Sequence, residues 1–233
     1  MVFLGTRNIS VFIIEMSLTK KSEFNKNKIK VLIKRLEEKY GEVECYLSHR
    51  NAFELLTAVI LSAQCTDERV NLVTPALFSR YPSPQKLALA KLTDLENVIK
   101  SCGFYKNKAK NLKAMAERLV SQHNSEVPDT MEELVALAGV GRKTANVVLG
   151  QWFKKSAGVV VDTHVSRISR LLGLTNEKTP EKIELDLNKL IPRKYWDIFS
   201  LWLIAHGRET CIARRPRCEG CMLSDICGFR ELG

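Results

Sequence analysis

Apolar residues recur three and four positions apart along most of the chain, which is the spacing of one face of an α-helix. The pattern is found at residues 29–36, 53–60, 95–99, 112–119, 134–137 and 183–191. Prolines and glycines separate these stretches and leave segments of about 8 to 20 residues, a normal helix length. Only residues 158–161 have the composition of a strand, and this stretch is too short to build a sheet. The pattern predicts an all-α protein.

Length and composition narrow the class of protein further. The chain has 233 residues, of which 45% are hydrophobic, so it can bury a large core in one domain or two lobes. No apolar stretch approaches the roughly 20 residues that a membrane-spanning helix needs. Residues 1–14 lack the basic start and cleavage site of a secretory signal, and translation starts at Met1 or Met16. We therefore expect a cytoplasmic protein without membrane contact.

Basic residues exceed acidic ones, and the excess is concentrated. The formal charge is +10, and basic runs cover residues 20–39, 100–120 and 142–155. Each run alone is typical of a solvated helix face. Three runs in one chain favour a polyanionic partner such as nucleic acid.

A glycine-rich turn lies between two of the predicted helices. Thr130 and Glu133 have the spacing of a capping box, in which the glutamate reaches back to the cap, and this helix is expected to run to Leu137. Gly139 and Gly141 permit a tight connection with positive φ. The pattern predicts a helix-hairpin-helix motif, in which backbone without Cβ atoms approaches a phosphate; an ordinary turn is the alternative.

The residues after the turn favour phosphate contact. Arg142 and Lys143 begin the second helix, where a helix dipole disfavours a cation by roughly 0.3–1 kcal/mol. A lysine that is partly a free amine can attack carbon and form a Schiff base. Position alone favours a phosphate-binding lysine, and the nucleophile is the alternative.

An acidic residue follows the apolar loop after this second helix. Asp162 precedes a helical pattern, so it has the position of an N-cap. The loop begins near the end of the helix that carries Lys143, which allows the two side chains to meet across one cleft. An N-cap aspartate is otherwise usually structural.

Four cysteines near the C-terminus form a C-x6-C-x2-C-x5-C array. Intracellular thiols stay reduced, so the array indicates thiolate ligation of a metal rather than disulfides. Both zinc and an iron–sulfur cluster accept four thiolates, and the single close pair mildly disfavours zinc. The array consists of Cys211, Cys218, Cys221 and Cys227, and the basic loop inside it carries Arg214, Arg215 and Arg217. The other cysteines, Cys45, Cys65 and Cys102, are interpreted as isolated core residues.

Together these motifs resemble the endonuclease III family of DNA glycosylases with abasic-site lyase activity. The resemblance covers about residues 51–229 in collinear order. It rests on residues 61–67, 103–109, 137–148 and 161–164 and on the cysteine array. One departure is the loop at residues 156–158, which lacks a proline often found there and leaves the loop path open.

The resemblance implies a two-lobed helix-hairpin-helix glycosylase fold. A six-helix barrel lobe would span residues 45–155, and residues 1–44 and 156–233 would form a lobe that carries one 4Fe-4S cluster on the four cysteines. The cluster is expected to support structure and DNA docking, with a redox role as the alternative.

The resemblance also implies a bifunctional reaction in base excision repair. Lys143 would attack the sugar C1′ as a Schiff-base nucleophile assisted by Asp162, and β-elimination would cleave the strand 3′ of the site. Gln64 would fill the gap in the duplex, and Phe104 would wedge into the stack, where relatives often have a smaller aliphatic residue. The remaining residues expected to contact DNA are Gly139, Val140, Gly141, Arg142 and the three loop arginines.

The implied partner is double-stranded DNA that contains oxidised pyrimidines or abasic sites, bound by a monomer. Two other functions remain open from the residues alone. One is a DNA-binding module without catalysis, and the other is a monofunctional glycosylase that releases a base without cutting the strand.

Overall fold

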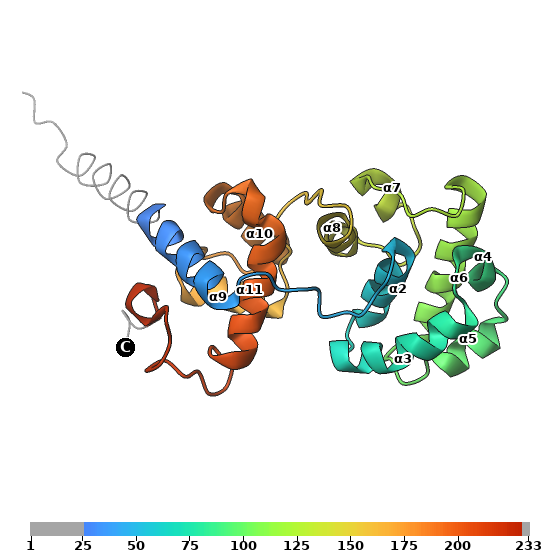
Figure 1. Cartoon of the computed structure of the whole chain (residues 1–233), viewed down its shortest axis with the longest axis horizontal. Helices are drawn as coiled ribbons and strands as arrows, with labels where there is room; N and C mark the ends of the chain where they lie inside the picture. The colour runs from blue at the N-terminus through green and yellow to red at the C-terminus, as the bar shows by residue number, and fades with distance from the viewer. Residues whose placement is uncertain (1–25, 230–233) are drawn as a thin grey trace, which may run out of the picture. The chain divides into compact units, whose positions relative to one another are not determined.

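The computed structural model describes residues 26–229, and these residues contain helices and no strand (Figure 1). The prediction of an all-α protein is confirmed. Residues 158–161 form no strand. The alternative start sites and the first part of the basic run at residues 20–39 lie outside the described residues.

The chain divides into two compact units. One comprises Val43–Val161 and Lys194–Leu201, and the other comprises Asp162–Arg193 together with the described parts of Met1–Glu42 and Trp202–Gly233. We call them the hairpin unit and the cysteine unit. The lobe boundaries implied by the family resemblance remain a prediction.

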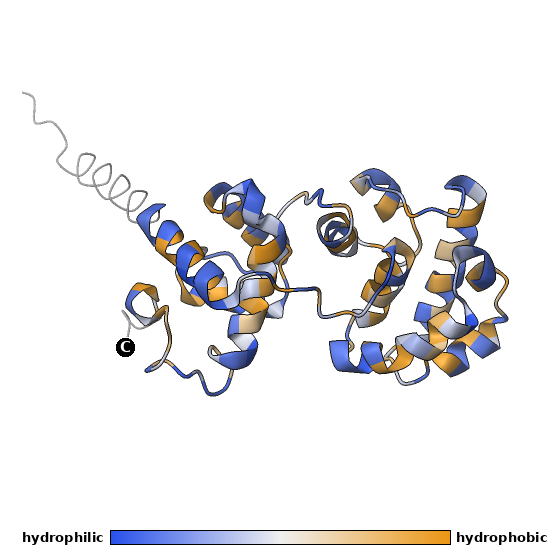
Figure 2. Cartoon of the chain, in the orientation of Figure 1, coloured by the Kyte–Doolittle hydropathy of each residue, from blue (hydrophilic) through white to orange (hydrophobic). Residues whose placement is uncertain are grey.

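The hairpin unit is built around one helix that is buried along its whole length. This helix is α2 (Ala52–Ser62), in which every residue from Phe53 to Leu61 is buried. Its neighbours are amphipathic, and their apolar faces are directed at the shared core (Figure 2). They are α3 (Asp67–Arg80), α4 (Pro84–Ala88), α5 (Leu92–Val98), α6 (Tyr105–Gln122), α7 (Met131–Val135) and α8 (Arg142–Gln151).

The cysteine unit contains fewer and more separated helices. Residues 26–40 are helical, and Leu32 and Leu36 on this helix are fully buried. The indole of Trp202 donates a hydrogen bond of 2.8 Å to the carbonyl oxygen of Gly41, which fixes the end of that helix. The other elements are α9 (Thr163–Leu171), α10 (Pro180–Leu190) and η2 (Ser224–Ile226); α11 (Trp196–Glu209) and η1 (Arg193–Tyr195) each contribute residues to both units.

Five of the described helix starts have a side-chain cap, and two of these caps, Thr130 and Asp162, are predicted from the sequence. The side chains of the N-cap residues accept a hydrogen bond from the amide three positions later, which satisfies one of the free donors at a helix start. This is seen at Asn51, Thr66, Ser83, Thr130 and Asp162. No helix within residues 26–229 is long and apolar enough to cross a membrane.

Candidate active site and nucleic-acid interface

The predicted hairpin is present between α7 and α8, with differences in detail. Thr130 Oγ1 accepts from the Glu133 amide at 3.3 Å, but it donates to the Glu133 carboxylate at 2.7 Å, so the glutamate does not reach back to the cap amide. Helix α7 ends at Val135 rather than Leu137. The Leu137 amide instead donates to the Leu134 carbonyl in a tight turn.

The two glycines of the hairpin have different roles. Gly139 has a φ of +75°, whereas Gly141 is the N-cap of α8 with a φ of −90°. The expectation that both need positive φ was wrong for Gly141. A Cβ on Gly139 would lie 2.9 Å from Asn111, whereas a Cβ on Gly141 would meet nothing within 4 Å. The fold therefore requires a glycine at position 139 and does not require one at position 141.

This asymmetry gives a testable pair of variants. Gly139→Ala is expected to lower the free energy of unfolding by about 2 kcal/mol, because it adds backbone strain and a clash with Asn111. Gly141→Ser is expected to leave stability within about 0.5 kcal/mol, since serine is a good N-cap residue. Urea unfolding of both proteins measures the difference. Equal losses of stability would contradict the assignment of the two glycines.

Lys143 lies in the first turn of α8. Its side chain is exposed and makes no hydrogen bond or ion pair with any residue in the described range. The helix has no side-chain cap, and its first intrahelical bond runs from the Ala145 amide to the Gly141 carbonyl. The preceding amides of the turn therefore point out of the helix start, where an anion can bind.

Val140, between the two glycines, was expected to contact DNA. Its side chain is only 6% exposed, and its amide donates to the Leu137 carbonyl at 3.2 Å. Val140 thus anchors the hairpin in the core. Arg142, in contrast, is exposed at the start of α8.

A buried asparagine fixes the loop after α8, and the sequence reasoning missed it. The Asn146 side chain donates to the Gly158 carbonyl at 2.7 Å and accepts from the Ala157 amide at 2.8 Å. Ser156 adds a hydrogen bond to the same Gly158 carbonyl. These bonds hold the loop without the proline whose absence had left its path open.

Asp162 is the N-cap of α9, as predicted. Its Oδ1 accepts from the Val165 amide at 2.8 Å. The second oxygen, Oδ2, has no hydrogen-bond partner in the part of the chain that the structure describes. The carboxylate therefore uses one oxygen to cap α9 and has its other oxygen unpaired among the described residues. Lys143 belongs to the hairpin unit and Asp162 begins the cysteine unit.

Gln64 and Phe104 lie in two neighbouring loops of the hairpin unit. Gln64 has a φ of 53° and Phe104 a φ of 57°, which is the left-handed region that non-glycine residues rarely adopt. A Cβ on Gly103 would lie 3.4 Å from the Gln64 carbonyl oxygen, so the two loops are in contact. The Phe104 ring is 65% exposed. Strain of this kind costs about 1–3 kcal/mol per residue and often marks a functional site.

Two of the cysteines interpreted as isolated are in fact neighbours. Burial and the adjacent Cys65 thiol, which shares a hydrogen bond with Cys102, raise the pKa of Cys102 to about 11. Lys108 is close to both thiols, and burial lowers the pKa of its ammonium group. Cys65 and Cys102 are 37 positions apart, so no short motif could indicate the pair.

All four cysteines of the C-terminal array line one apolar cavity of about 190 Å³. Burial raises the pKa of Cys221, the hydrogen bond from the Leu223 amide lowers it, and the other three thiols of the array raise it further. Within the described residues, however, no three His, Cys, Asp or Glu side chains converge as ligands of a metal ion.

Hydrogen-bond donors surround the cavity. Arg167 on α9 donates to Cys211 Sγ at 3.3 Å and to the Cys211 carbonyl at 2.6 Å. The Leu223 amide donates to Cys221 Sγ at 3.4 Å. Hydrogen bonds to ligating sulfurs are a common means by which proteins stabilise iron–sulfur groups.

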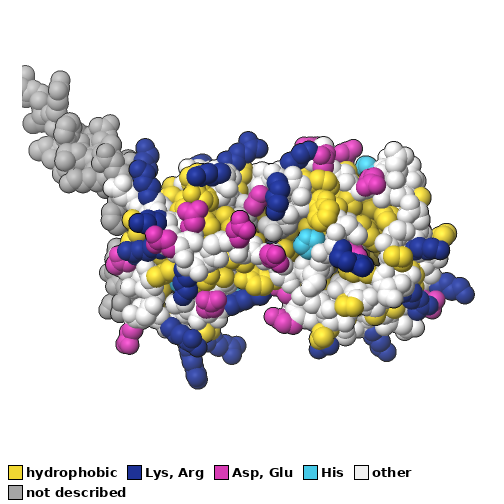
Figure 3. Space-filling view, in the orientation of Figure 1, with side chains coloured by type: hydrophobic (Ala, Val, Ile, Leu, Met, Phe, Trp, Pro, Cys, Tyr) yellow, Lys and Arg dark blue, Asp and Glu magenta, His cyan; other side chains and the backbone are white. Residues whose placement is uncertain are grey.

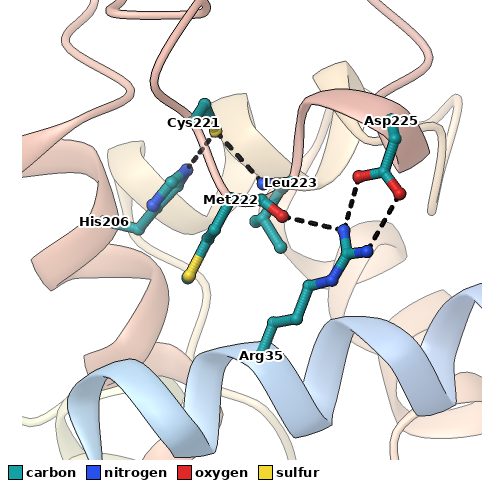
Figure 4. A network of polar contacts seen from close by, with 6 residues as sticks. All are labelled: Arg35, His206, Cys221, Met222, Leu223 and Asp225. Atoms are coloured by element: carbon teal, nitrogen blue, oxygen red, sulfur yellow. Dashed lines mark hydrogen bonds and ion pairs between the residues drawn. The ribbon is translucent and has the colours of Figure 1, made fainter.

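A buried histidine also contacts the array (Figure 4). His206 Nε2 lies 3.6 Å from Cys221 Sγ, and its Nδ1 lies 3.2 Å from the Tyr40 hydroxyl. Burial, with Lys39 and Arg167 nearby, lowers the pKa of His206 to about 4, so it is neutral at pH 7.

An ion pair joins the helix at residues 26–40 to the C-terminal segment. The Arg35 guanidinium binds both carboxylate oxygens of Asp225 and donates to the Met222 carbonyl at 2.8 Å (Figure 4). The hydrogen bond from Arg35 holds the pKa of Asp225 below its usual value. The cysteine-bearing segment is thereby attached to the remainder of its unit.

The loop between Cys211 and Cys218 is exposed and basic. The Arg217 amide donates to the Thr210 carbonyl at 2.9 Å and closes the loop. Over the face in view, basic side chains elsewhere are interspersed with acidic ones (Figure 3). The exposed arginines expected to bind phosphate are Arg214, Arg215 and Arg217.

Comparisons with known proteins account for this arrangement. Residues 57–193 match the HhH-GPD superfamily of base excision DNA repair proteins. The chain is 48% identical to endonuclease III of Synechocystis sp. over 91% of this chain and 96% of that protein. The chain belongs to the endonuclease III family. The resemblance seen in the sequence motifs is confirmed.

Solved structures of endonuclease III have the same fold. A non-covalent complex of endonuclease III with DNA superposes with a TM-score of 0.83 at 40% identity and covers 89% of this chain and 97% of that one. A trapped covalent intermediate of endonuclease III with DNA gives the same TM-score and identity, with 89% and 99% covered. The protein is accordingly a DNA glycosylase and abasic-site lyase of base excision repair.

Proposed function

We propose that this member of the endonuclease III family excises oxidised pyrimidines from duplex DNA through a Schiff base on Lys143 and then cleaves the strand 3′ of the site. The observation that carries the proposal is the exposed Lys143 amine, which has no partner among the described residues and stands in the first turn of α8. A lysine recruited for structure would be expected to have an acceptor. The solved covalent intermediate of a protein 40% identical to this one supports the same chemistry.

The reaction begins when the damaged nucleotide leaves the stack, because its C1′ cannot be reached inside a duplex. Gln64 and Phe104 are exposed in strained, adjoining loops and are suited to occupy the gap. The backbone amides at the start of α8 are suited to hold a phosphate of the DNA backbone, because no atom lies within 4 Å of the space beside Gly141 that a Cβ would occupy.

In the chemical step, the Lys143 amine attacks C1′ and the base leaves with the bonding electrons. Loss of a proton from nitrogen and opening of the sugar ring give an imine, which acidifies the proton on C2′. Removal of that proton expels the 3′ phosphate by β-elimination. The Oδ2 atom of Asp162 has no partner among the described residues and is the group proposed to stabilise the developing positive charge.

The proposal is tested by borohydride trapping on a duplex with one abasic site. Reduction is expected to give one covalent adduct, and mass spectrometry of its peptides is expected to place the linkage at Lys143. An adduct on another residue would contradict the nucleophile assignment. Base release without any adduct or strand cut would favour a monofunctional glycosylase.

We also propose that Cys211, Cys218, Cys221 and Cys227 hold one 4Fe-4S cluster. The shared cavity and the donors to sulfur from Arg167 and the Leu223 amide support this fit. When bound, the cluster would supply a structural anchor for the arginine loop, and no reaction step depends on it.

Metal analysis tests the cluster proposal. The purified protein is expected to contain iron and acid-labile sulfide in the amounts of one 4Fe-4S cluster, with visible absorbance of thiolate-bound iron. Cys221→Ser is expected to lose both, whereas Cys45→Ser, in the other unit, is expected to keep them. Stoichiometric zinc in protein purified without added metal would contradict the assignment.

The partner of this site is double-stranded DNA with damaged pyrimidines or abasic sites, in keeping with the DNA complexes of its relatives. We expect the protein to act as a monomer on DNA in the cytoplasm. A panel of duplexes with one lesion each, including thymine glycol, would define the preferred base.

A further inference from the structure

Lys108 is a buried lysine of α6 that bonds to the end of α2, close to both candidate insertion loops. Its side chain is 5% exposed, and its ammonium donates to the Leu61 carbonyl at 2.8 Å, in the last turn of α2 just before Gln64. Its backbone amide donates to the Phe104 carbonyl at 3.1 Å, which is the first intrahelical bond of α6 and does not depend on the side chain. The Lys108 side chain therefore connects the end of α2, before Gln64, to the start of α6, which follows Phe104.

The burial of this cation is unfavourable unless something compensates for the lost hydration. The negative end of the α2 dipole provides part of the compensation, since Leu61 is among the last residues of that helix. The remaining neighbours are the thiols of Cys65 and Cys102. An apolar residue would fill the same space without the desolvation cost. The function of the ammonium is therefore its hydrogen bond to the Leu61 carbonyl.

What it binds is a helix end with an unusual geometry. Helix α2 does not end in a glycine cap; Ala63 has a φ of −57° and a ψ of 113°, Gln64 follows with a φ of 53°, and the Cys65 amide closes this turn on the Ser62 carbonyl at 3.0 Å. A non-glycine residue keeps such a conformation only where its surroundings impose it. The Lys108 ammonium holds the last turn of α2, and the contact of Gly103 with the Gln64 carbonyl joins the two loops.

We infer that Lys108 is a positioning residue that holds the Gln64 and Phe104 loops in one arrangement, so that both side chains enter the duplex together. The inference rests on the proposed function, because it assigns Lys108 a part in the insertion step of that reaction. Lys108 does not touch DNA; it acts through the two loops.

The test replaces Lys108 with methionine, which keeps the apolar stem and removes the ammonium. Lys113→Met is the matched control: Lys113 lies on the same helix, and its ammonium also binds backbone carbonyls, those of Ala88 and Ala90, far along the chain from both loops. Thermal unfolding of both variants checks that they remain folded.

Base excision from a lesion duplex is expected to fall about a hundredfold in Lys108→Met under single-turnover conditions, because small errors in position are costly at a reacting site. Lys113→Met is expected to retain the wild-type rate. At saturating protein, 2-aminopurine placed opposite an abasic-site analogue is expected to lose its insertion-dependent fluorescence change in Lys108→Met alone.

A mutant cycle separates positioning from a general loss of stability. In a Gln64→Ala, Phe104→Ala background, Lys108→Met should have little further effect, because the side chains that it positions are already absent. A full additional loss in that background, or wild-type excision by Lys108→Met, would overturn the inference. Failure of the proposed function would differ, since the wild-type protein itself would then form no borohydride adduct.

Discussion

Lys143→Ala is expected to lose the borohydride adduct and to incise abasic-site duplex at least about 10⁴-fold more slowly than the wild-type protein, as is usual when a nucleophile is removed. No other described residue supplies an exposed amine in the first turn of α8. The measurement is single-turnover strand cleavage on a gel together with the yield of trapped complex. Folding should not change, because the Lys143 side chain is exposed and makes no hydrogen bond or ion pair with a described residue.

Lys143→Arg separates the two roles that the sequence left open. Arginine binds phosphate at least as well as lysine, but it stays protonated and forms no imine. A phosphate-binding role predicts substantial activity in Lys143→Arg, whereas a nucleophilic role predicts that it is as inactive as Lys143→Ala. Lys91→Ala, an exposed lysine at the start of α5 without a capping bond, is the surface control. Activity in the arginine variant would exclude the Schiff-base assignment.

Asp162→Asn is expected to slow base excision about 10²–10³-fold, which is typical for loss of one electrostatic contact in a transition state. Asparagine keeps an oxygen for the Val165 amide and remains an N-cap, so α9 should be preserved. The substitution removes the charge and replaces Oδ2 by an amide group, while the capping oxygen is kept. Single-turnover excision measured beside thermal unfolding checks both parts of the expectation.

Asp162→Ala provides the contrast. This variant loses the cap as well as the charge, and stability is expected to fall by about 1 kcal/mol. If aspartate were only a cap, Asp162→Asn would be active and Asp162→Ala would be impaired through folding. If the carboxylate takes part in the reaction, the two variants should be similarly inactive although only one is destabilised.

Local patterns in the sequence predicted the features that depend on neighbouring residues. Helical periodicity indicated an all-α fold, and the polar residue before an apolar pattern identified Asp162 as an N-cap. The same reasoning placed Lys143 in the first turn of its helix. Each of these features is determined within one or two turns of chain, so a single sequence contains enough information.

Features that depend on distant contacts were not predicted. The need for a glycine at position 139 arises from Asn111 as well as from φ, and the burial of Lys108 arises from α2. Trp152, which follows α8, is 40% exposed, and its ring packs edge-on against His49, a contact that no local pattern indicates. In each case the environment of the residue depends on another residue far away in the sequence. Periodicity carries no information about which segments pack together.

Helix α9 links the proposed catalytic carboxylate to the cysteine cavity within one unit. Asp162 caps its first turn, while Arg167 and Leu171, further along the same helix, line the cavity. The nine residues of α9 thus connect a proposed catalytic carboxylate to a proposed metal site. If the cavity holds an iron–sulfur cluster, protein made in an iron-starved cell would lack it, and α9 would hold the Asp162 carboxylate less rigidly. The rate of base excision would then depend on the iron supply through the rigidity of α9, and no electron transfer would be required.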